Sequence, residues 1–281
     1  MTYRILCRRL SDAGIDTPSA EAALLLSHFC GVSHASLMAD PDREWKSDAL
    51  EDAVRRRIER QPLQYILGEW SFFEETYTVS PHCLIPRADT EILVEHAIRA
   101  LPHGAHFADL CTGSGCIAIS TLAHRPDCKA LAVDLFPETL ALARHNAERN
   151  GVADRLKFQQ ADVLDPRIPD AEAPFDAILS NPPYIPSTTV DTLDPELAFE
   201  PRAALDGGED GLIFYRAIVK NFAQHLTPKG FILFEIGYDQ EQALKTIAAS
   251  CGFVCSVERD LAGNPRVARL DRRKDHYGTN H

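Results

Sequence analysis

The sequence predicts an α/β fold in which a mostly parallel, doubly wound sheet is covered by helices on both faces, preceded by a small all-helical domain. Beyond residue 106, apolar strands alternate with helices, which is typical of parallel sheets. The first 70 or so residues show short helical patterns instead, and aromatic and β-branched residues separate the two regions. We therefore expect a helical domain at 1–70, a hairpin linker at 71–84 and an α/β domain at 85–281.

Helix start and stop signals define the N-terminal region. One helix is expected at 4–13. A second begins after Thr17, which can cap it, with Pro18 at the first helical position and Gly31 closing it. A further helix is expected at 48–60, and the arginine run 55–57 in it is either a solvated face or a contact for RNA or an acidic protein.

The later region alternates regularly between the two element types. Strands are expected at 107–110, 130–134, 156–160, 175–180 and 231–236, and helices at 115–123 and 137–150. A short hairpin is expected between Trp70 and Cys83, where aromatic and β-branched residues cluster.

Composition limits the classes of partner. The chain of 281 residues carries 29 basic and 41 acidic side chains, a formal net charge of −12, so we expect no direct binding of nucleic acid. It shows neither an apolar run of roughly 20 residues nor a signal core, which predicts a cytoplasmic protein without a membrane segment. The eight cysteines and eleven histidines do not match disulfide-scaffold or metal-ligand spacing. We expect reduced thiols, no metal and a monomer.

A glycine-rich turn follows the first expected strand of the sheet. Residues 109–118 read Asp-Leu-Cys-Thr-Gly-Ser-Gly-Cys-Ile-Ala, and glycines at such a strand-to-helix turn let the backbone approach a ligand. Asp134 ends the next strand, where a carboxylate that binds a ribose belongs. Gly113, Gly115 and Ala118 also fit a dinucleotide pattern, so a nicotinamide enzyme remains an alternative at this point.

The tetrapeptide Asn181-Pro182-Pro183-Tyr184 follows the strand at 175–180. Successive prolines fix φ and remove two backbone donors, which leaves carbonyl oxygens free to accept. The Asn181 side-chain oxygen and the Pro182 carbonyl can each accept one hydrogen of a planar NH₂ group, and Tyr184 can lie against its plane. This geometry suits the transfer of an electrophilic methyl group to an amide or an exocyclic amine. A strand-ending turn is the alternative without a function.

Together these motifs make the chain resemble the S-adenosylmethionine-dependent N-methyltransferases, and more narrowly the glutamine methyltransferases of peptide-chain release factors. The resemblance extends through 84–91, 200–212 and 260–266 and includes the helical region up to residues 64–69. It implies the class I methyltransferase fold with a seven-stranded sheet, a methyltransferase catalytic domain at 85–281, and a helical domain that docks part of the release factor. The implied target is the glutamine of the factor's Gly-Gly-Gln loop.

The resemblance also implies roles for individual residues. Cofactor-binding residues would be Cys111, Thr112, Gly113, Ser114, Gly115, Asp134, Asp162, Val163 and Asn181. Catalytic residues would be Asn181, Pro182 and Tyr184, and the substrate would be bound by Arg87, Glu91, Asn181, Pro182, Pro183 and Tyr184. For Arg87 and Glu91, an interdomain salt bridge is an equal alternative.

Two positions depart from the relatives' usual pattern. Cys111 stands where they usually have glycine, so the backbone there is not expected to rely on a positive φ. Val163 stands where they often place an aromatic residue, and an aliphatic side chain can still cover the adenine. The glycine- and acid-rich block at 206–211 is expected to be a flexible turn, either a solvated loop or a lid.

Several alternative functions remain open on the sequence. Methylation of a ribosomal-protein glutamine would use the same chemistry, whereas methylation of adenine N6 would need a basic groove for the nucleic acid. A nicotinamide dehydrogenase lacks an evident hydride-transfer residue. A silent binding module would bind the cofactor without turnover, and the intact Asn181 argues against it.

Overall fold

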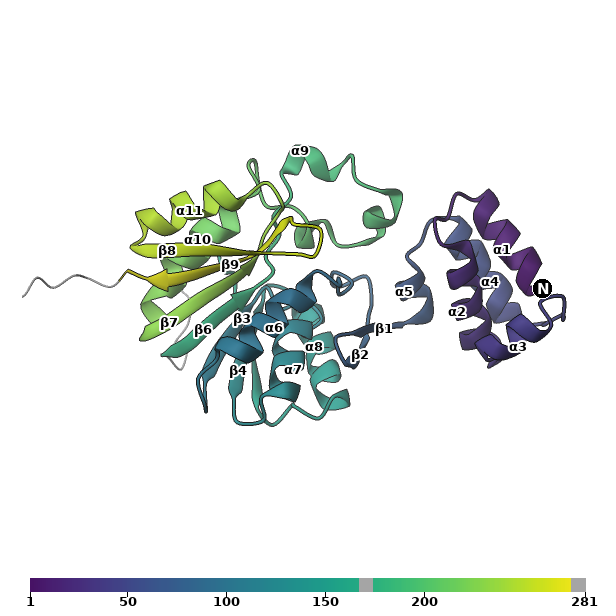
Figure 1. The fold of residues 1–281 in the computed structure, drawn as a ribbon, viewed down its shortest axis with the longest axis horizontal. Helices are drawn as coiled ribbons and strands as arrows, with labels where there is room; N and C mark the ends of the chain where they lie inside the picture. The colour runs from purple at the N-terminus through teal and green to yellow at the C-terminus, as the bar shows by residue number, and fades with distance from the viewer. Residues whose placement is uncertain (167–173, 274–281) are drawn as a thin grey trace, which may run out of the picture. The chain divides into compact units, whose positions relative to one another are not determined.

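The computed structural model describes residues 1–166 and 174–273, and the chain divides into two compact units. The first unit is Met1–Trp70 together with the short segment Asp194–Phe199, and the second comprises the rest of the described chain (Figure 1). Within the described residues, we find no helix that is both long and apolar enough to cross a membrane. All eight cysteines are free thiols.

The first unit is a set of short helices around its own apolar core. The helices are α1 (Tyr3–Asp12), α2 (Pro18–Cys30), α3 (His34–Ala39), α4 (Asp48–Ile58) and α5 (Leu63–Leu67). Pro18 occupies the first turn of α2, and Gly31 ends that helix with φ 64°, as predicted. Thr17 makes no capping hydrogen bond through its side chain, so the predicted cap is wrong, and the proline supplies the start of α2.

The arginine run of α4 is only partly a solvated face. Arg55 is exposed, but Arg57 is buried, with Nε donating to Glu21 at 2.6 Å and Nη1 donating to Glu196 at 3.2 Å. Arg60 reaches the same Glu196 carboxylate at 2.8 Å. A buried guanidinium needs such partners because an uncompensated charge is costly away from water. These ion pairs hold the segment Asp194–Phe199 in the first unit.

The residues expected to form a linker are anchored in the second unit. Strands β1 (Glu69–Phe72) and β2 (Glu75–Thr78) form a separate two-stranded sheet. Tyr77 is fully buried, and its hydroxyl is 2.7 Å from the hydroxyl of Ser120. Asn146 also bonds the backbone of Thr78 in both directions, so the hairpin from Ser71 onward belongs to the second unit.

The second unit is built on a seven-stranded sheet in the order β5-β4-β3-β6-β7-β9-β8. The strands are β3 (His106–Leu110), β4 (Lys129–Asp134), β5 (Leu156–Gln160), β6 (Phe175–Ser180), β7 (Leu226–Glu235), β8 (Phe253–Arg259) and β9 (Pro265–Arg272). Neighbouring strands are parallel except that β9 runs antiparallel to both β7 and β8. The predicted fold class is confirmed. Its predicted strands match β3 to β6 to within one residue, whereas β7 begins five residues before the strand predicted at 231–236.

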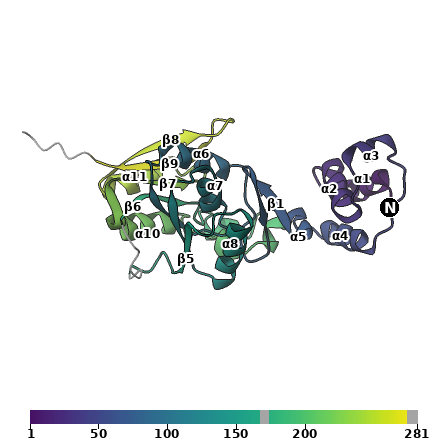
Figure 2. The same ribbon diagram turned by 90° about the horizontal axis from the view of Figure 1, so that it is seen from below.

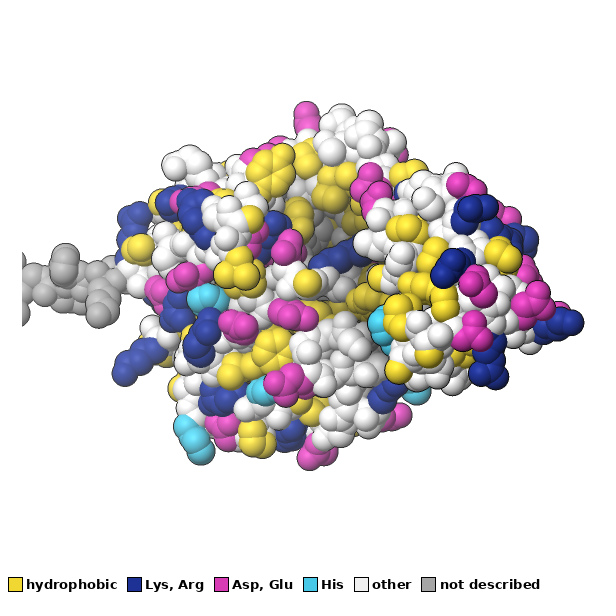
Figure 3. Space-filling model, turned by 45° about the vertical axis from the view of Figure 1, so that its right-hand side comes forward, with side chains coloured by type: hydrophobic (Ala, Val, Ile, Leu, Met, Phe, Trp, Pro, Cys, Tyr) yellow, Lys and Arg dark blue, Asp and Glu magenta, His cyan; other side chains and the backbone are white. Residues whose placement is uncertain are grey.

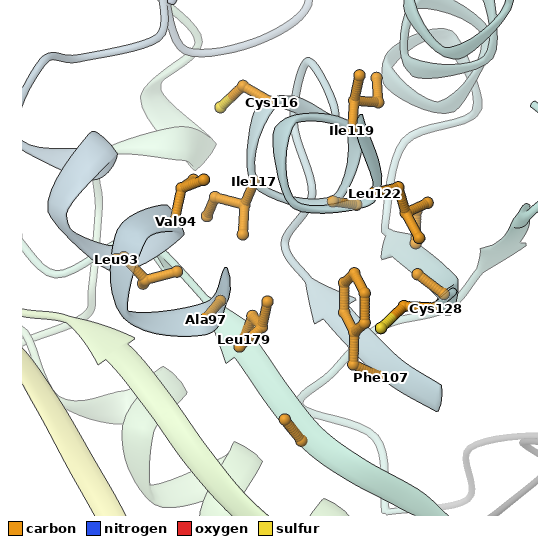
Figure 4. Packing of buried hydrophobic residues seen from close by; sticks show 14 of the residues in the cluster. Leu93, Val94, Ala97, Phe107, Cys116, Ile117, Ile119, Leu122, Cys128 and Leu179 are labelled. Carbon is orange, nitrogen blue, oxygen red and sulfur yellow. The ribbon is translucent and has the colours of Figure 1, made fainter. Parts of the chain in front are cut away.

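Helices cover both faces of this sheet (Figures 1 and 2). One face is packed by α6 (Thr90–Ala100), α7 (Cys116–His124) and α8 (Pro137–Arg149), and the other by α10 (Ile213–Phe222) and α11 (Glu241–Ser250). The short helix α9 (Ser187–Val190) lies in the long connection that leads to α10. In Figure 4, Val94 of α6 and Ile117 of α7 lie close together, beside Leu179 of β6. This packing fixes the first residue of α6, Thr90, relative to the sheet.

The strand order creates a crevice at one edge of the sheet. From β3 the chain moves outward through β4 to β5 and then returns to the opposite side of β3 as β6. The connections after β3 and β6 therefore leave in opposite directions, and ligands of open α/β sheets bind at such a switch point. The glycine turn follows β3, and the Asn181 tetrapeptide follows β6.

Candidate active site

A cavity of about 290 Å³ lies at this switch point, entirely within the second unit. Ten of the predicted site residues line it: Arg87, Cys111, Thr112, Gly113, Ser114, Asp134, Asp162, Val163, Asn181 and Pro183. Four others, Glu91, Gly115, Pro182 and Tyr184, are not among its lining residues. The structure therefore brings most of the predicted cofactor and substrate residues to one place.

The glycine turn has the conformation that a close backbone approach requires. Thr112 N donates to Val133 O of β4 at 3.0 Å, and Gly115 N donates to Thr112 O at 2.9 Å. Cys111 has φ 60°, so the expectation that this position does without a positive φ is wrong. A left-handed conformation costs a residue with a side chain roughly 1–2 kcal/mol, which the anchoring of the next residue to β4 offsets. Gly115 has φ 83°, and a Cβ there would lie 2.8 Å from Ile119 Cδ1 and 3.3 Å from Ala143 Cβ, so a side chain at this position would be strained.

A buried carboxyl group, that of Asp109, holds this turn in place through hydrogen bonds. Asp109 Oδ2 accepts from Thr112 Oγ1 at 2.6 Å and from Ala118 N at 3.2 Å. Burial raises the pKa of Asp109 to about 7, against the opposing effect of these two hydrogen bonds. Its Oδ1 has no hydrogen-bond partner among the described residues. The carboxyl thus fixes both ends of the turn, the loop at Thr112 and the start of α7 near Ala118.

Asp134 ends β4 at the wall of the cavity. Its Oδ2 accepts from Gly113 N at 3.0 Å and its Oδ1 accepts from Phe136 N at 3.2 Å. Burial raises the pKa of this carboxyl, and the backbone donors partly counter the effect. Each oxygen keeps further acceptor capacity, so a diol can donate to a carboxylate that is already fixed in place.

The wall beyond Asp134 is largely apolar. Val163 is buried and lines the cavity together with Leu135, Phe136 and Leu164. Asp162 Oδ1 accepts from Leu164 N at 2.8 Å, and Val163 O accepts from Asn221 of α10 at 3.2 Å. These bonds hold an aliphatic surface that could cover a planar base.

The Asn181 tetrapeptide begins at the residue after β6. Ser180 Oγ donates to Leu110 O at 2.6 Å, which ties the end of β6 to the end of β3. Asn181 Nδ2 donates to Thr90 Oγ1 at 3.2 Å, and Tyr184 OH donates to Glu235 Oε1 at 3.3 Å. The sequence reasoning missed Thr90 and Glu235, although a carboxylate ending an apolar strand is the same signal that indicated Asp134.

The glycine-rich block at 206–211 is solvated only in part, because Glu209 and Asp210 are exposed whereas Gly207 and Gly211 are buried, and Asp206 lines the cavity, so a lid role stays a prediction. Gly207 packs against the backbone of the tetrapeptide, since a Cβ there would lie 2.8 Å from Pro183 O, and its N donates to O of Ile185, the residue after the tetrapeptide, at 2.8 Å. A Cβ on Gly211, whose φ is 71°, would lie 2.4 Å from Tyr184 O. The block therefore supports the tetrapeptide through contacts that only glycine permits.

Arg87 and Glu91 have separate environments. Arg87 lines the cavity and pairs with the buried carboxylate of Glu200, which also accepts from Ile85 N at 3.0 Å. Both partners belong to the second unit, so this salt bridge is not interdomain. Glu91 Oε1 accepts from Phe73 N at 2.9 Å, which anchors the hairpin, and its contact with substrate stays a prediction.

The fold is that of a methyltransferase. Residues 87–209 match the family described as the methyltransferase small domain. A crystal structure of a methyltransferase from Pyrococcus furiosus is similar to this chain with a TM-score of 0.56 at 18% sequence identity, covering 78% of this chain and 98% of that one. At that identity the similarity supports the fold alone.

The particular family follows from the whole chain. Residues 3–68 match the family described as the PrmC N-terminal domain. The chain is 39% identical over 266 residues to the release factor glutamine methyltransferase of Caulobacter vibrioides, covering 92% of this chain and 91% of that protein. The enzyme of the same name from Cereibacter sphaeroides is 40% identical over 269 residues, covering 93% of this chain and 95% of that protein. The protein belongs to the release factor glutamine methyltransferases.

Proposed function

We propose that this protein transfers a methyl group from S-adenosylmethionine to the side-chain nitrogen of the glutamine in the Gly-Gly-Gln loop of a peptide-chain release factor. The single observation that carries the proposal is the position of Asn181, which shares one cavity with the glycine turn and Asp134. A group that accepts hydrogen bonds from an amide therefore lies beside residues that suit an adenosine-containing cofactor.

The residues present fit that cofactor. The left-handed turn from Cys111 to Gly115 offers a backbone cradle that a Cβ at Gly115 would disrupt. Asp134 offers a fixed carboxylate for ribose hydroxyls, and the apolar wall around Val163 suits a planar base. When bound, the cofactor supplies an electrophilic methyl group on sulfur.

The chain's own contribution to the reaction is to hold the amide. An amide nitrogen is a poor nucleophile because its lone pair is delocalised into the carbonyl group. Asn181 Oδ1 and the Pro182 carbonyl each accept one hydrogen of the NH₂ group, which moves electron density back toward nitrogen. A fixed orientation in line with the methyl supplies much of the rate gain. As the nitrogen bonds to the methyl carbon, the carbon–sulfur bond would break with its electron pair remaining on sulfur. The nitrogen would then give one proton to water, so no side-chain base is required.

The surface charge favours a protein substrate over a nucleic acid. The formal net charge is −12, and the face drawn in Figure 3 shows acidic side chains interspersed among the basic ones. Methylation of adenine would need a positive groove that neutralises phosphates. The charge balance therefore argues against that alternative.

The first unit is proposed to dock a second part of the release factor. Its surface exposes Ile5, Leu24 and Met38, at 52%, 42% and 47% of their full areas. Exposed apolar side chains of this size are the kind of surface that partner binding can cover. Leu24→Asp should raise KM for the intact factor and leave KM for a short Gly-Gly-Gln peptide unchanged. An equal change for both substrates would contradict docking by this unit.

The decisive experiment is peptide mass spectrometry of an unmodified release factor incubated with this protein and S-adenosylmethionine. We expect the mass of one methyl group to appear on the glutamine of Gly-Gly-Gln, and no methylation when that glutamine is changed to alanine. A methyl group found instead on a ribosomal protein or on nucleic acid would overturn the substrate. The absence of transfer to any of them would overturn the enzymatic function.

A further inference from the structure

A chain of hydrogen bonds lies behind Asn181 and ends on a buried carboxyl group. Asn181 Nδ2 donates to Thr90 Oγ1 at 3.2 Å, and Thr90 Oγ1 donates to Glu235 Oε2 at 2.5 Å. Tyr184 OH donates to the other oxygen of the same carboxylate at 3.3 Å. Thr90 is the first residue of α6 and Glu235 the last of β7, and both side chains are buried.

The proton of Thr90 decides which way the Asn181 amide faces. An ionised carboxylate can only accept, so the single hydroxyl proton of Thr90 is committed to Glu235. The Thr90 oxygen then presents a lone pair to Asn181, and the Asn181 side chain donates a hydrogen bond to it from its NH₂ group. Asn181 Oδ1 is left without a hydrogen-bond donor among the described residues, at a position that lines the cavity. The amide oxygen is therefore the group available to a substrate NH₂.

We infer that Glu235 is a positioning residue that acts through Thr90 to hold the Asn181 side chain as a hydrogen-bond acceptor for the substrate amide. The inference rests on the proposed function, since it concerns how the same site selects an amide. It adds Thr90, which also lines the cavity, and Glu235, which is not among the lining residues, to the determinants of specificity.

Protonation of Glu235 would reverse the chain of donors. A neutral carboxyl can donate to Thr90, whose own proton is then free to point at Asn181. Asn181 Oδ1 would then accept a hydrogen bond from the Thr90 hydroxyl, and the NH₂ group of Asn181 would face the NH₂ group of the substrate. Two donors cannot form a hydrogen bond with each other, so the bound amide would lose one of its acceptors.

The surroundings of Glu235 make this reversal accessible near neutral pH. Burial raises the pKa of Glu235 to about 7, while Thr90, Arg266 and Tyr184 oppose the rise and Asp89 adds to it. These groups lie in or next to α6, β9 and the tetrapeptide. From α10, Tyr215 OH donates to the backbone oxygen of Glu235 at 2.9 Å. From α7, Cys116 is also close enough for the charge of Glu235 to raise the pKa of its thiol. Activity should therefore fall as pH is lowered through about 7.

The test compares Thr90→Val with Thr90→Ser in the full-length protein. Valine removes the hydroxyl at constant shape, whereas serine keeps it. Binding is measured by calorimetry with S-adenosylhomocysteine present, using a Gly-Gly-Gln peptide and a Gly-Gly-Glu peptide. The wild-type protein should prefer glutamine, and Thr90→Val should reduce that preference by about tenfold or more, because Asn181 is then free to offer its NH₂ group to the carboxylate. Thr90→Ser should retain the preference.

The pH profile supplies a second readout. In the wild-type protein, kcat/KM for the glutamine peptide should decline on the acid side of about 7, and Glu235→Gln should remove that decline because it has no proton to gain. Thr246→Val, which removes an exposed hydroxyl on α11, serves as the control and should change neither the preference nor the profile.

Two results would overturn the inference. Either both peptides weaken equally in Thr90→Val and serine fails to restore the preference, or the acid decline persists in Glu235→Gln. Failure of the proposed function looks different, because the wild-type protein itself would then not methylate the glutamine peptide at any pH.

Discussion

Two buried carboxyl groups support the two halves of the cavity in different ways. Asp109 holds the glycine turn through Thr112 and Ala118, three and nine residues further along the chain. Glu235 holds the tetrapeptide region through Thr90 and Tyr184, which lie 145 and 51 residues away. Burial raises both pKa values to about 7. The half proposed to bind the cofactor (the cofactor half) is thus a local structure with a fixed backbone. The half proposed to bind the substrate (the substrate half) is assembled from elements distant in the sequence, which fix its side chains.

The strongest way to separate the two halves is to remove the amide acceptor. Asn181→Ala should reduce turnover by orders of magnitude, because the substrate nitrogen loses an acceptor and its orientation. Affinity for S-adenosylmethionine should stay within several-fold, since the glycine turn and Asp134 remain. Calorimetry and single-turnover kinetics measure the two effects. Unchanged turnover would remove Asn181 from the mechanism.

The contact between Gly211 and the tetrapeptide can be tested by measuring the stability of the protein. Gly211→Ala should lower the free energy of unfolding by about 2–4 kcal/mol, because the new Cβ meets Tyr184 O and the residue has a positive φ. The matched control is Gly263→Ala, which has φ 87° but open space around the new Cβ, and it should cost only about 1 kcal/mol. Denaturant titration measures both. Equal decreases in the free energy of unfolding for the two variants would show that the contact with the tetrapeptide does not contribute to stability.

The cofactor half has its own test. Asp134→Ala should weaken the binding of S-adenosylmethionine by about 1–3 kcal/mol, because a charged acceptor of the ribose hydroxyls is lost. Affinity for the glutamine peptide should change less. An unaltered calorimetric affinity for the cofactor would refute the ribose role of Asp134.

The smallest expected effect distinguishes the two carboxyl groups by pH. A carboxyl whose folded pKa is raised to about 7 binds its proton more tightly in the folded state, so stability falls as pH rises from about 4 to about 7. Asp109→Asn should flatten part of this slope in denaturant titrations and leave the acid side of the kcat/KM profile intact. Loss of the acid decline in Asp109→Asn would show that the two groups are not independent.

The sequence predicted those site residues that are marked by a local pattern in the chain. The glycine turn, Asp134 and Asn181 each stand at the end of an apolar strand, so their convergence follows from the parallel sheet. Thr90 carried no such signal, because a threonine at the start of a helix is ordinary. Glu235 ended an apolar strand but had no recognisable partner nearby in the chain.

Other predictions from the sequence failed for the same reason, because they depend on contacts between residues that are distant in the chain. The solvated-face interpretation fails at Arg57 because its partners Glu21 and Glu196 lie 36 and 139 residues away. The glycines of the block at 206–211 suggested a flexible turn, but Gly207 and Gly211 lie against the backbone of the tetrapeptide, where a Cβ would clash. Strands β8 and β9 were not predicted, although the family resemblance implied the seven strands of the sheet.

The ion pairs of Arg57 have a consequence for the order of events during synthesis. Residues 1–70 leave the ribosome long before Glu196 is made, so the first unit must fold at first with Arg57 paired to Glu21 alone. Domains generally fold in order of emergence. We expect the nascent helical unit to be less stable than the same helices in the finished protein, where Glu196 also balances Arg57 and Arg60. Completion of the N-terminal unit thus waits for chain that is translated after the tetrapeptide.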